Sequence, residues 1–532
     1  MTRVRNPTTD SSRSMVTSTK GIVATSHPLA TGAAVQILEA GGTAGDAAVA
    51  AAAVLNVTEP HMTGIGGDMF MIFWSASEGQ LSGLDSSGQS GSKTDPQALI
   101  DQGLESVPEP GQKSVTVPGA LAGWQALLDR YGLMSMADVL APAIRIAEDG
   151  FLLTPIVAQE WADSSSLLQV DEGARATYLR KGQAPRAGER ITNLDLANSL
   201  RTIAQNGIDT FYGKTLGQKI TDGLDKLGGY LTIEDLADHT VRWVEPMRVD
   251  YKGYTLHEIP PAGQGIAALQ MIKILEEFDV GGMRHNSVEY LHTLIEVKRL
   301  AYADLERHIA DPAHMTVQPE SLLDGKYLKH RATLINPCGV SENPDPRGLY
   351  TESETVYLTV ADQYGNMISF INSLCGYFGS GVVIPETGIL LQNRGSGFTL
   401  EAGHPNQIAP RKKPLHTIIP AFVTQEEKPL LSFGVMGGSM QPQGQIQVLL
   451  NMIEFGMDIQ QAINAPRFRH LNGVTVAVEN LDPETTQALQ HLGHKLEDPS
   501  QTTFGGSQAI LNLGEGWAAG SDVRKDGMAA GH

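Results

Sequence analysis

An apolar strand pattern that starts at Thr355 follows directly on a segment that cannot form regular structure. The upstream residues 336–348 read Asn-Pro-Cys-Gly-Val-Ser-Glu-Asn-Pro-Asp-Pro-Arg-Gly, a composition that excludes a helix or an interior strand. If the bond between Glu354 and Thr355 were cut, Thr355 would carry both a hydroxyl nucleophile and a free α-amine. The sequence therefore predicts a mobile linker over about 336–354 and a strand that starts at Thr355, and cleavage of the Glu354–Thr355 bond would turn that residue into a nucleophile with its own base.

Bulk composition excludes several classes of partner. The chain has 532 residues, of which 41% are hydrophobic and 18% charged, as in ordinary globular proteins. Its 39 Lys and Arg against 59 Asp and Glu give a net charge of -20, which repels nucleic acid and anionic membranes. We therefore expect neither as a partner. The N-terminus lacks an apolar core segment, so no secretory signal is predicted and the expected setting is cytoplasmic.

Metal and cofactor chemistry find no support in the pattern of ligating residues. The histidines are scattered and no His-Glu-x-x-His motif occurs, so no metal is expected. Gly64-Ile-Gly66-Gly67-Asp68 matches neither the dinucleotide-binding nor the P-loop spacing, and no cofactor is expected. The two cysteines, Cys338 and Cys375, give no disulfide framework, although counting alone allows one bridge.

The order of the periodic segments predicts an α+β fold in segregated layers. Two Ala-rich helices over residues 28–55 precede a glycine turn and an apolar strand at residues 62–74, typical of a strand buried on both faces. The region from about 120 to 340 is predicted to be mainly helical, with runs at 120–131, 136–148, 194–205 and 288–308. Short strands are then predicted at 355–361, 367–372, 388–391, 416–424 and 430–435, before a helix at 443–455.

Two further features suit a nucleophile at Thr355. An antiparallel return of the next strand would bring the hydroxyl of Ser373 back to the Thr355 end. The pair Gly437-Gly438 precedes a helix, and its bare amides could form an oxyanion hole. Each feature also has an ordinary interpretation, because Thr is favoured in strands and most glycine pairs are turns.

Ordered motifs along nearly the whole chain resemble the gamma-glutamyltransferase family. They are Thr25-Ser-His-Pro-Leu-Ala, Gly41-Gly-Thr-Ala-Gly-Asp, Glu59-Pro-His-Met-Thr-Gly-Ile-Gly-Gly, Val117-Pro-Gly, Phe378-Gly-Ser-Gly, Gly437-Gly-Ser, Ala465-Pro-Arg-Phe and Ser521-Asp. The resemblance implies a four-layer αββα sandwich of the N-terminal-nucleophile hydrolases and a proenzyme that cleaves itself into subunits 1–354 and 355–532. It also implies that the two subunits stay associated, with a dimer of heterodimers as one further assembly.

The resemblance implies roles for the site residues. Thr355 matches the nucleophile, Ser373 the hydroxyl that supports it, and Gly437 and Gly438 the oxyanion pair. Departures affect the part that recognises the substrate. Asp85-Ser86-Ser87-Gly88 stands where the family has Asp-x-Arg-Glu, so the arginine that holds an α-carboxylate is missing.

Substitutions at the positions that bind an α-ammonium point to a different substrate. Cys375, Arg394 and Gly397 stand where the family has Asn, Gln and Asp, and His416 and Thr417 replace its paired serines. A cation at Arg394 would repel an ammonium group and favour an anionic one. The expected substrate is a small anionic amide bound by Arg394, His416 and Thr417. A surface salt bridge is the other interpretation of Arg394.

The motifs Thr-Val-Tyr-Leu-Thr-Val, Gln-Asn-Arg-Gly and Gly-Val-Met-Gly-Gly resemble the oxamate-hydrolysing branch of that family. The resemblance implies hydrolysis of oxamate to oxalate and ammonia, in purine-nitrogen salvage. The run Arg411-Lys-Lys is predicted to be a solvated loop. Two alternatives stay open: a γ-glutamyltransferase or glutathione hydrolase with relocated recognition residues, and an inactive family member that acts as a binding protein.

Overall fold

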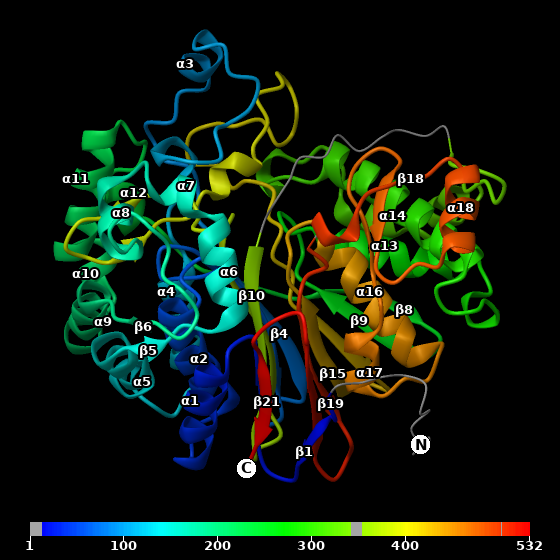
Figure 1. The fold of residues 1–532 in the computed structure, drawn as a ribbon, viewed down its shortest axis with the longest axis horizontal. Helices are drawn as coiled ribbons and strands as arrows, with labels where there is room; N and C mark the ends of the chain where they lie inside the picture. The colour runs from blue at the N-terminus through cyan, green and yellow to red at the C-terminus, as the bar shows by residue number, and fades with distance from the viewer. Residues whose placement is uncertain (1–12, 342–353, 502) are drawn as a thin grey trace.

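Two antiparallel sheets lie face to face between two layers of helices (Figure 1). The structure is a computed structural model and describes residues 13–341, 354–501 and 503–532. The sheet that contains β10, here called sheet I, has seven strands in the order β21 (Met528–Gly531), β2 (Ile22–Thr25), β10 (Glu354–Ala361), β11 (Met367–Cys375), β3 (Asp68–Ser75), β4 (Gln80–Ser86) and β7 (Arg242–Val244). The predicted four-layer αββα sandwich is confirmed.

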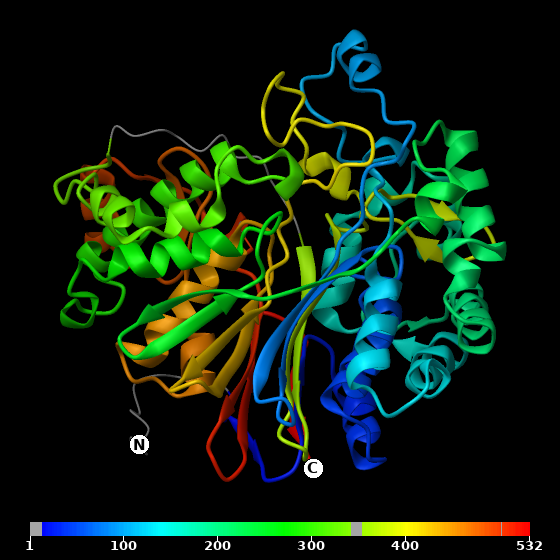
Figure 2. The same cartoon turned by 180° about the vertical axis from the view of Figure 1, so that it is seen from behind.

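The second sheet, here called sheet II, also has seven strands. Their order is β1 (Val16–Ser18), β20 (Trp517–Ser521), β19 (Ser507–Asn512), β15 (Lys428–Val435), β14 (Ala421–Gln425), β9 (Tyr254–Glu258) and β8 (Met247–Tyr251). Seen from behind, the β8–β9 hairpin forms one edge of this sheet (Figure 2). Both halves of the sequence therefore contribute strands to each sheet.

The helices divide between the two outer faces. Sheet I is covered by α1 (Pro28–Glu39), α2 (Ala44–Thr58), α4 (Ala120–Tyr131), α5 (Met136–Asp149) and α9 (Leu194–Asn206). Sheet II is covered by α13 (Gly265–Leu275), α14 (Val288–His308), α16 (Met440–Ile453) and α17 (Ile459–Asn464). Helix α2 is buried along its whole length, because its alanines allow neighbouring elements to approach closely. Thr43 and Asp46 close its first turn with a reciprocal capping box.

Shorter elements complete the fold. The strands are β5 (Phe151–Leu152), β6 (Arg190–Ile191), β12 (Val383–Ile384), β13 (Ile389–Leu390), β16 (Phe468–His470), β17 (Thr475–Val478) and β18 (Lys495–Leu496). The helices are α3 (Pro96–Asp101), α6 (Pro155–Asp163), α7 (Ser165–Leu168), α8 (Glu172–Tyr178), α10 (Asp209–Tyr212), α11 (Thr215–Leu227), α12 (Ile233–Ala237), α15 (Gly325–Ala332) and α18 (Pro483–His491). Within the described ranges, no helix combines the length and the apolar character that crossing a membrane requires.

Close contact between the sheets depends on a missing side chain. The ring of Tyr357 on β10 lies against Gly434 on β15, where a Cβ atom would be only 2.4 Å from the ring. The Tyr357 hydroxyl lies 2.8 Å from Ser369 Oγ, so its polar end has a partner inside the sandwich. Any side chain at Gly434 would push sheet II away from β10.

Most predicted elements are present, with two differences. The strand predicted at 416–424 begins only at Ala421. The region predicted to be helical from 120 to 340 also supplies β7, β8 and β9, which form edges of both sheets. In β8, buried or partly buried residues alternate with exposed ones, so this strand lacks the apolar run that marked the interior strands.

Candidate active site

A row of buried polar side chains crosses one end of sheet I. Ser373 on β11 pairs with Asp68 on β3, and an irregularity between Glu354 and Val356 on β10 places Thr355 beside Ser373. The Thr355 hydroxyl donates to Ser373 Oγ over 3.1 Å, and all three side chains in the row are fully buried. The predicted return of β11 to the Thr355 end is therefore confirmed.

The Ser373 hydroxyl is the point on which several donors converge. Besides Thr355 Oγ1, it accepts from the Cys375 amide over 2.8 Å and from Arg394 Nη2 over 3.1 Å. Cys375 has a φ of 80°, which turns the end of β11 so that its amide faces back to Ser373. The candidate nucleophile Thr355, the end of β11 at Cys375 and the Arg394 cation are thus connected through the Ser373 oxygen.

Arg394 lies inside the protein and not in a surface salt bridge. Its residue is fully buried at the start of a 3₁₀ turn, Arg394–Gly397, and its Nη1 donates to Thr417 Oγ1 over 2.7 Å. Its Nε has no hydrogen-bond partner, and no carboxylate of the described chain forms an ion pair with it. A buried guanidinium without a contacting carboxylate is costly, and its planar edge suits an anionic ligand.

His416 faces Asp68 and not the Thr355 hydroxyl. Its Nε2 lies 3.0 Å from Asp68 Oδ2, while its Nδ1 accepts from the Ile418 amide over 3.4 Å. Burial and the nearby Arg394 cation hold the pKa of His416 well below its usual value. The ring is therefore neutral, and the two partners assign the proton to Nε2, which donates to Asp68.

Asp68 collects donors from three loops. Its Oδ1 accepts from the amides of Gly88 and Gly119, both over 3.1 Å, and from Gln392 Nε2 over 3.1 Å. Burial raises the pKa of Asp68 to about 6, although the Arg394 cation acts in the opposite direction. Sequence reasoning did not select Asp68, whose only signal is an acidic residue at the head of an apolar strand.

The Gly437-Gly438 pair forms a turn in front of α16. Its φ values of 114° and 57° lie where L side chains are rare. Gln264 Nε2 donates to the Gly438 carbonyl over 2.8 Å and also bonds the Thr417 carbonyl. Within the described chain, the amides of Gly437 and Gly438 donate no hydrogen bond. Two amides without an acceptor can donate to a ligand, which is one condition for an oxyanion hole.

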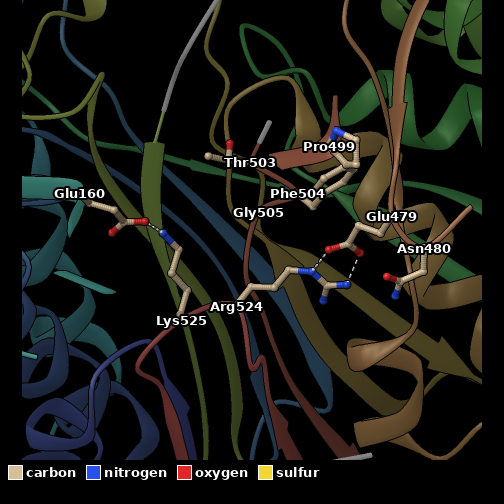
Figure 3. Close-up of a pocket in the computed structure, with 9 residues that line it drawn as sticks. All are labelled: Glu160, Glu479, Asn480, Pro499, Thr503, Phe504, Gly505, Arg524 and Lys525. Carbon is tan, nitrogen blue, oxygen red and sulfur yellow. Dashed lines mark hydrogen bonds and ion pairs between the residues drawn. The ribbon is translucent and has the colours of Figure 1, made fainter. Parts of the chain in front are cut away.

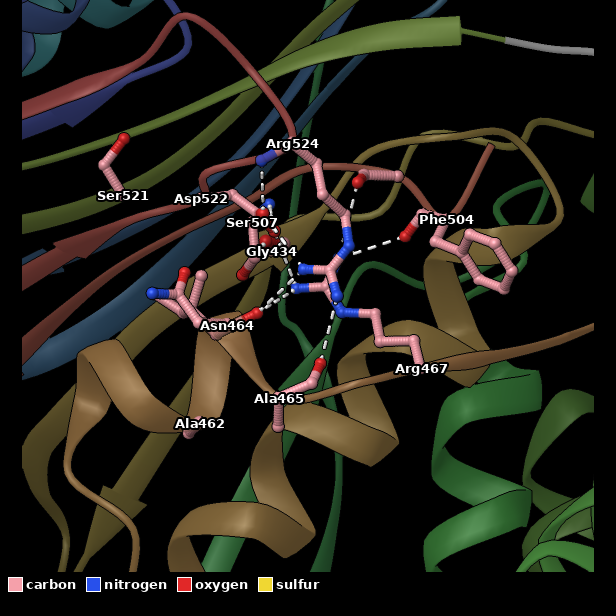
Figure 4. Close-up of polar contacts among 12 residues, drawn as sticks. Gly434, Ala462, Asn464, Ala465, Arg467, Phe504, Ser507, Ser521, Asp522 and Arg524 are labelled. Carbon is pink, nitrogen blue, oxygen red and sulfur yellow. Dashed lines mark hydrogen bonds and ion pairs between the residues drawn. The ribbon is translucent and has the colours of Figure 1, made fainter. Parts of the chain in front are cut away.

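A buried ionic network fixes the segment behind that turn (Figure 4). Arg467 donates to Asp522 Oδ2 over 2.8 Å and to the Phe504 carbonyl over 3.0 Å. Burial alone would raise the pKa of Asp522, but the guanidinium groups of Arg467 and Arg524 hold it below its usual value. The motifs around residues 465–468 and 521–522 thus meet, and Gly505 packs against Gly437.

The solvated loop predicted at residues 411–413 is confirmed for the exposed Arg411 but not for the two lysines. Lys412 is buried and its ammonium donates to two backbone carbonyls, while Lys413 Nζ lies 3.1 Å from Asp85 Oδ2. Arg242 also contacts Asp85, and these two cations hold the pKa of Asp85 well below its usual value although burial acts the other way. The prediction for the lysines failed because it rested on the run of like charges alone. The sequence does not show that Lys413 lies beside the buried carboxylate of Asp85.

Gly66 and Gly67 serve close backbone packing. A Cβ atom at Gly66 would lie 2.0 Å from the Leu390 carbonyl oxygen, and one at Gly67 would lie 2.2 Å from that of Ser373. The glycine turn therefore presses against β11 at the candidate site. Of the predicted linker, Ser341 is bound through its amide to Glu296 on α14, and residues 342–353 lie outside the described residues.

Two cavities flank this end of the sandwich. One of about 790 Å³ is bordered by Gly376 and Asn393, the immediate neighbours of Cys375 and Arg394. The other, of about 380 Å³, is bordered by Thr503, Phe504 and Gly505 (Figure 3). Thr503 and Glu160 border both cavities, so the two adjoin.

Comparison with known proteins gives matches over the full length. The family profile described as "Gamma-glutamyltranspeptidase" matches residues 30–532. The chain is 38% identical over 530 residues to the "Glutathione hydrolase-like YwrD proenzyme" of Bacillus subtilis (strain 168), covering 97% of this chain and 99% of the relative. It is 34% identical over 533 residues to the "Oxamate amidohydrolase proenzyme" of Klebsiella pneumoniae subsp. pneumoniae, covering 97% and 99%.

The solved structures give the same result. The crystal structure of cephalosporin acylase from Bacillus halodurans superposes with a TM-score of 0.91 at 39% identity, covering 100% of this chain and 99% of the other. The gamma-glutamyltranspeptidase from Pseudomonas nitroreducens gives a TM-score of 0.56 at 32% identity over 59% of this chain.

Asp68 predicts a particular pH dependence of stability. A carboxyl group with a raised native pKa contributes stability that is present below its unfolded-state pKa and is lost as the pH rises through about 6. Asp68→Asn removes this titration. The unfolding free energy of the wild type minus that of the variant should therefore fall by on the order of 2–3 kcal/mol between pH 4 and pH 7.

Denaturant unfolding at several pH values measures this difference. Asp138→Asn is the control, because hydrogen bonds from Ser135 lower the pKa of Asp138 and its stability change has the opposite sign. A difference for Asp68→Asn that is flat or rises over the same window would contradict a buried carboxyl with a raised pKa.

Proposed function

Since the chain belongs to the gamma-glutamyltranspeptidase family, whose relatives include glutathione hydrolase and oxamate amidohydrolase proenzymes, we propose that it is a self-cleaving amidohydrolase with Thr355 as its nucleophile. Cleavage after Glu354 divides it into subunits 1–354 and 355–532, which remain associated because each sheet contains hydrogen-bonded strands of both fragments. The supporting observation for the nucleophile is the buried hydrogen bond between Thr355 and Ser373.

In the proposed mechanism, the new α-amine of Thr355 takes the proton from its own hydroxyl, directly or through one water. An α-amine titrates at about 7.7–8.0, so a useful fraction is free base at neutral pH. The Thr355 oxygen adds to the amide carbon, and the amides of Gly437 and Gly438 stabilise the oxyanion. The C–N bond then breaks, the amine leaves with the proton, and water cleaves the acyl ester.

The proposed substrate follows from the position of Arg394. Its guanidinium bonds the same Ser373 oxygen as the Thr355 hydroxyl, so a substrate carboxylate held by Arg394 lies close to the attacked carbon. In oxamate the carboxylate carbon is bonded directly to the amide carbon, at about 1.5 Å. Oxamate therefore matches the short reach from cation to nucleophile. Thr417 orients the guanidinium, and His416 contributes through Asp68, whose field acts on Arg394.

The second candidate is γ-glutamyl transfer or hydrolysis, which the name of the relative from Bacillus subtilis favours. A γ-glutamyl group places its carboxylate four bonds from the amide carbon and adds an ammonium group. That ammonium would lie close to the buried guanidinium of Arg394, and the two cations would repel each other on the kcal/mol scale. The geometry thus favours a short anionic acyl group. A family member without activity, acting as a binding protein, is the third candidate.

Self-cleavage separates the enzyme candidates from the binding protein. Purified wild type should run on a denaturing gel as two fragments, whereas Thr355→Ala should stay at 57.0 kDa because no hydroxyl is present to attack the preceding bond. Thr359→Ala is the control, since Thr359 is another buried threonine of β10 and the variant should still split. A wild type that stays intact would support the inactive binding protein.

The charge of the acyl group is tested with a pair of substrates of equal size. Oxamide carries an uncharged amide in place of the carboxylate of oxamate. Wild type should favour oxamate over oxamide in kcat/KM by roughly ten- to a hundredfold, the range that a charge-assisted hydrogen bond supplies. Arg394→Gln should remove that preference.

Arg411→Gln, which removes an exposed cation, should retain the preference for oxamate. Ammonia release measures both substrates, and γ-glutamyl-p-nitroanilide is assayed beside them. Efficient turnover of the γ-glutamyl compound with none of oxamate would contradict the proposed substrate and favour the second candidate.

A further inference from the structure

The larger cavity lies where the amine half of an amide substrate would leave. Gly376 and Asn393 on one wall adjoin Cys375 and Arg394, which flank the candidate nucleophile. Thr503 on another wall leads through Phe504 to Gly505, which packs against Gly437. A substrate attacked at Thr355 with its carboxylate on Arg394 therefore extends its nitrogen substituent into this cavity. At about 790 Å³ the space exceeds what the ammonia of oxamate needs.

Arg469 on β16 is a buried cation with unused donors on the wall of this cavity. The residue is 5% exposed, and its Nη1 donates to the carbonyl and the hydroxyl of Thr503, both over 2.7 Å. Its Nε has no hydrogen-bond partner, and within the described ranges Nη2 donates none and no carboxylate pairs with the group. The neighbouring Arg467 and Arg524 are both paired with Asp522. Arg469 alone of the three lacks an anion.

The acidic residues of the cavity do not neutralise Arg469. Glu109, Asp163 and Glu497 are exposed, so solvent and salt screen their charges. Glu160 is bound by Lys525 and His61. The poorly screened and unpaired charge on this wall is therefore positive.

We propose that this cavity binds the leaving half of the substrate and that Arg469 binds a carboxylate on it. This inference rests on the proposed amidohydrolase function and extends it to N-oxalyl amino acids, which carry a carboxylate on each side of the scissile bond. With an oxalyl acyl group, water adds across the C–N bond, and oxalate and a free amino acid are released. The proton taken from the Thr355 hydroxyl leaves on the amino nitrogen.

The test compares two substrates that differ only in the charge of the leaving half, N-oxalylglycine and N-oxalylglycinamide. Wild type should favour N-oxalylglycine in kcat/KM by about tenfold or more. Arg469→Gln should reduce this ratio to about 1 while kcat/KM for oxamate stays within about twofold, because oxamate does not reach Arg469. Arg469→Lys should retain part of the preference, and Arg186→Gln, which removes an exposed cation outside the cavity, should retain all of it.

Several results would overturn the inference. The first is a wild-type kcat/KM ratio of N-oxalylglycine to N-oxalylglycinamide near 1. The second is an equal loss of kcat/KM for oxamate and N-oxalylglycine in Arg469→Gln. The third is a preference for the cationic N-oxalylethylenediamine, which would show that the acidic residues of the cavity bind the leaving half. If oxamate is not hydrolysed and γ-glutamyl-p-nitroanilide is, the proposed acyl group fails separately. The same comparison is then made with γ-glutamylglycine and γ-glutamylglycinamide. A higher kcat/KM for γ-glutamylglycine that Arg469→Gln abolishes would support the role of Arg469, and equal kcat/KM values in the wild type would contradict it.

Discussion

One hydroxyl oxygen, Ser373 Oγ, holds the candidate site together. It accepts from Thr355, from the backbone of Cys375 and from Arg394, so β10, the end of β11 and the 3₁₀ turn at Arg394–Gly397 meet at a single atom. The position of that oxygen is set by the fold, because β11 is paired on both sides and Gly67 packs directly on the Ser373 carbonyl. A shift of β11 by one residue would turn Ser373 to the other face and separate all of these groups.

Buried charge explains the polar residues around this oxygen. No carboxylate of the described residues contacts Arg394, and its field acts on Asp68, which in turn binds a neutral His416. A buried cation is stabilised by such a neighbour and by an anionic ligand that arrives in contact. The same reasoning connects Arg394 with the acyl half of a substrate and Arg469 with the leaving half. In the two proposals together, Arg394 and Arg469 bind carboxylates on opposite sides of the bond that is broken.

Local sequence signals were sufficient for part of this arrangement. The strand patterns at 355–361 and 367–372 predicted the β10–β11 hairpin and so the contact between Thr355 and Ser373, and the glycine pair before α16 predicted its turn. The family motifs gave the four layers. These features were predictable because they depend on residues close in sequence, or on motifs whose order is preserved along the chain.

Features that depend on lateral packing could not be read from the sequence. Asp68 enters the site because β3 lies beside β11, and Gln264, in the loop that follows β9, reaches Gly438. Lys413 was misassigned because its partner Asp85 is distant in sequence. Arg469 gave no signal, because the sequence does not show which of several neighbouring cations are paired with an acid. The structure shows that Arg467 and Arg524 are paired with Asp522, whereas Arg469 has no such partner among the described residues.

The central claim is that a break in the backbone makes Thr355 the first residue of a new chain and gives its hydroxyl an adjacent amine. N-terminal sequencing of the shorter fragment of purified, active protein tests this most directly. We expect the fragment to begin Thr-Val-Tyr-Leu, starting at Thr355. A fragment that begins at any other residue would contradict it.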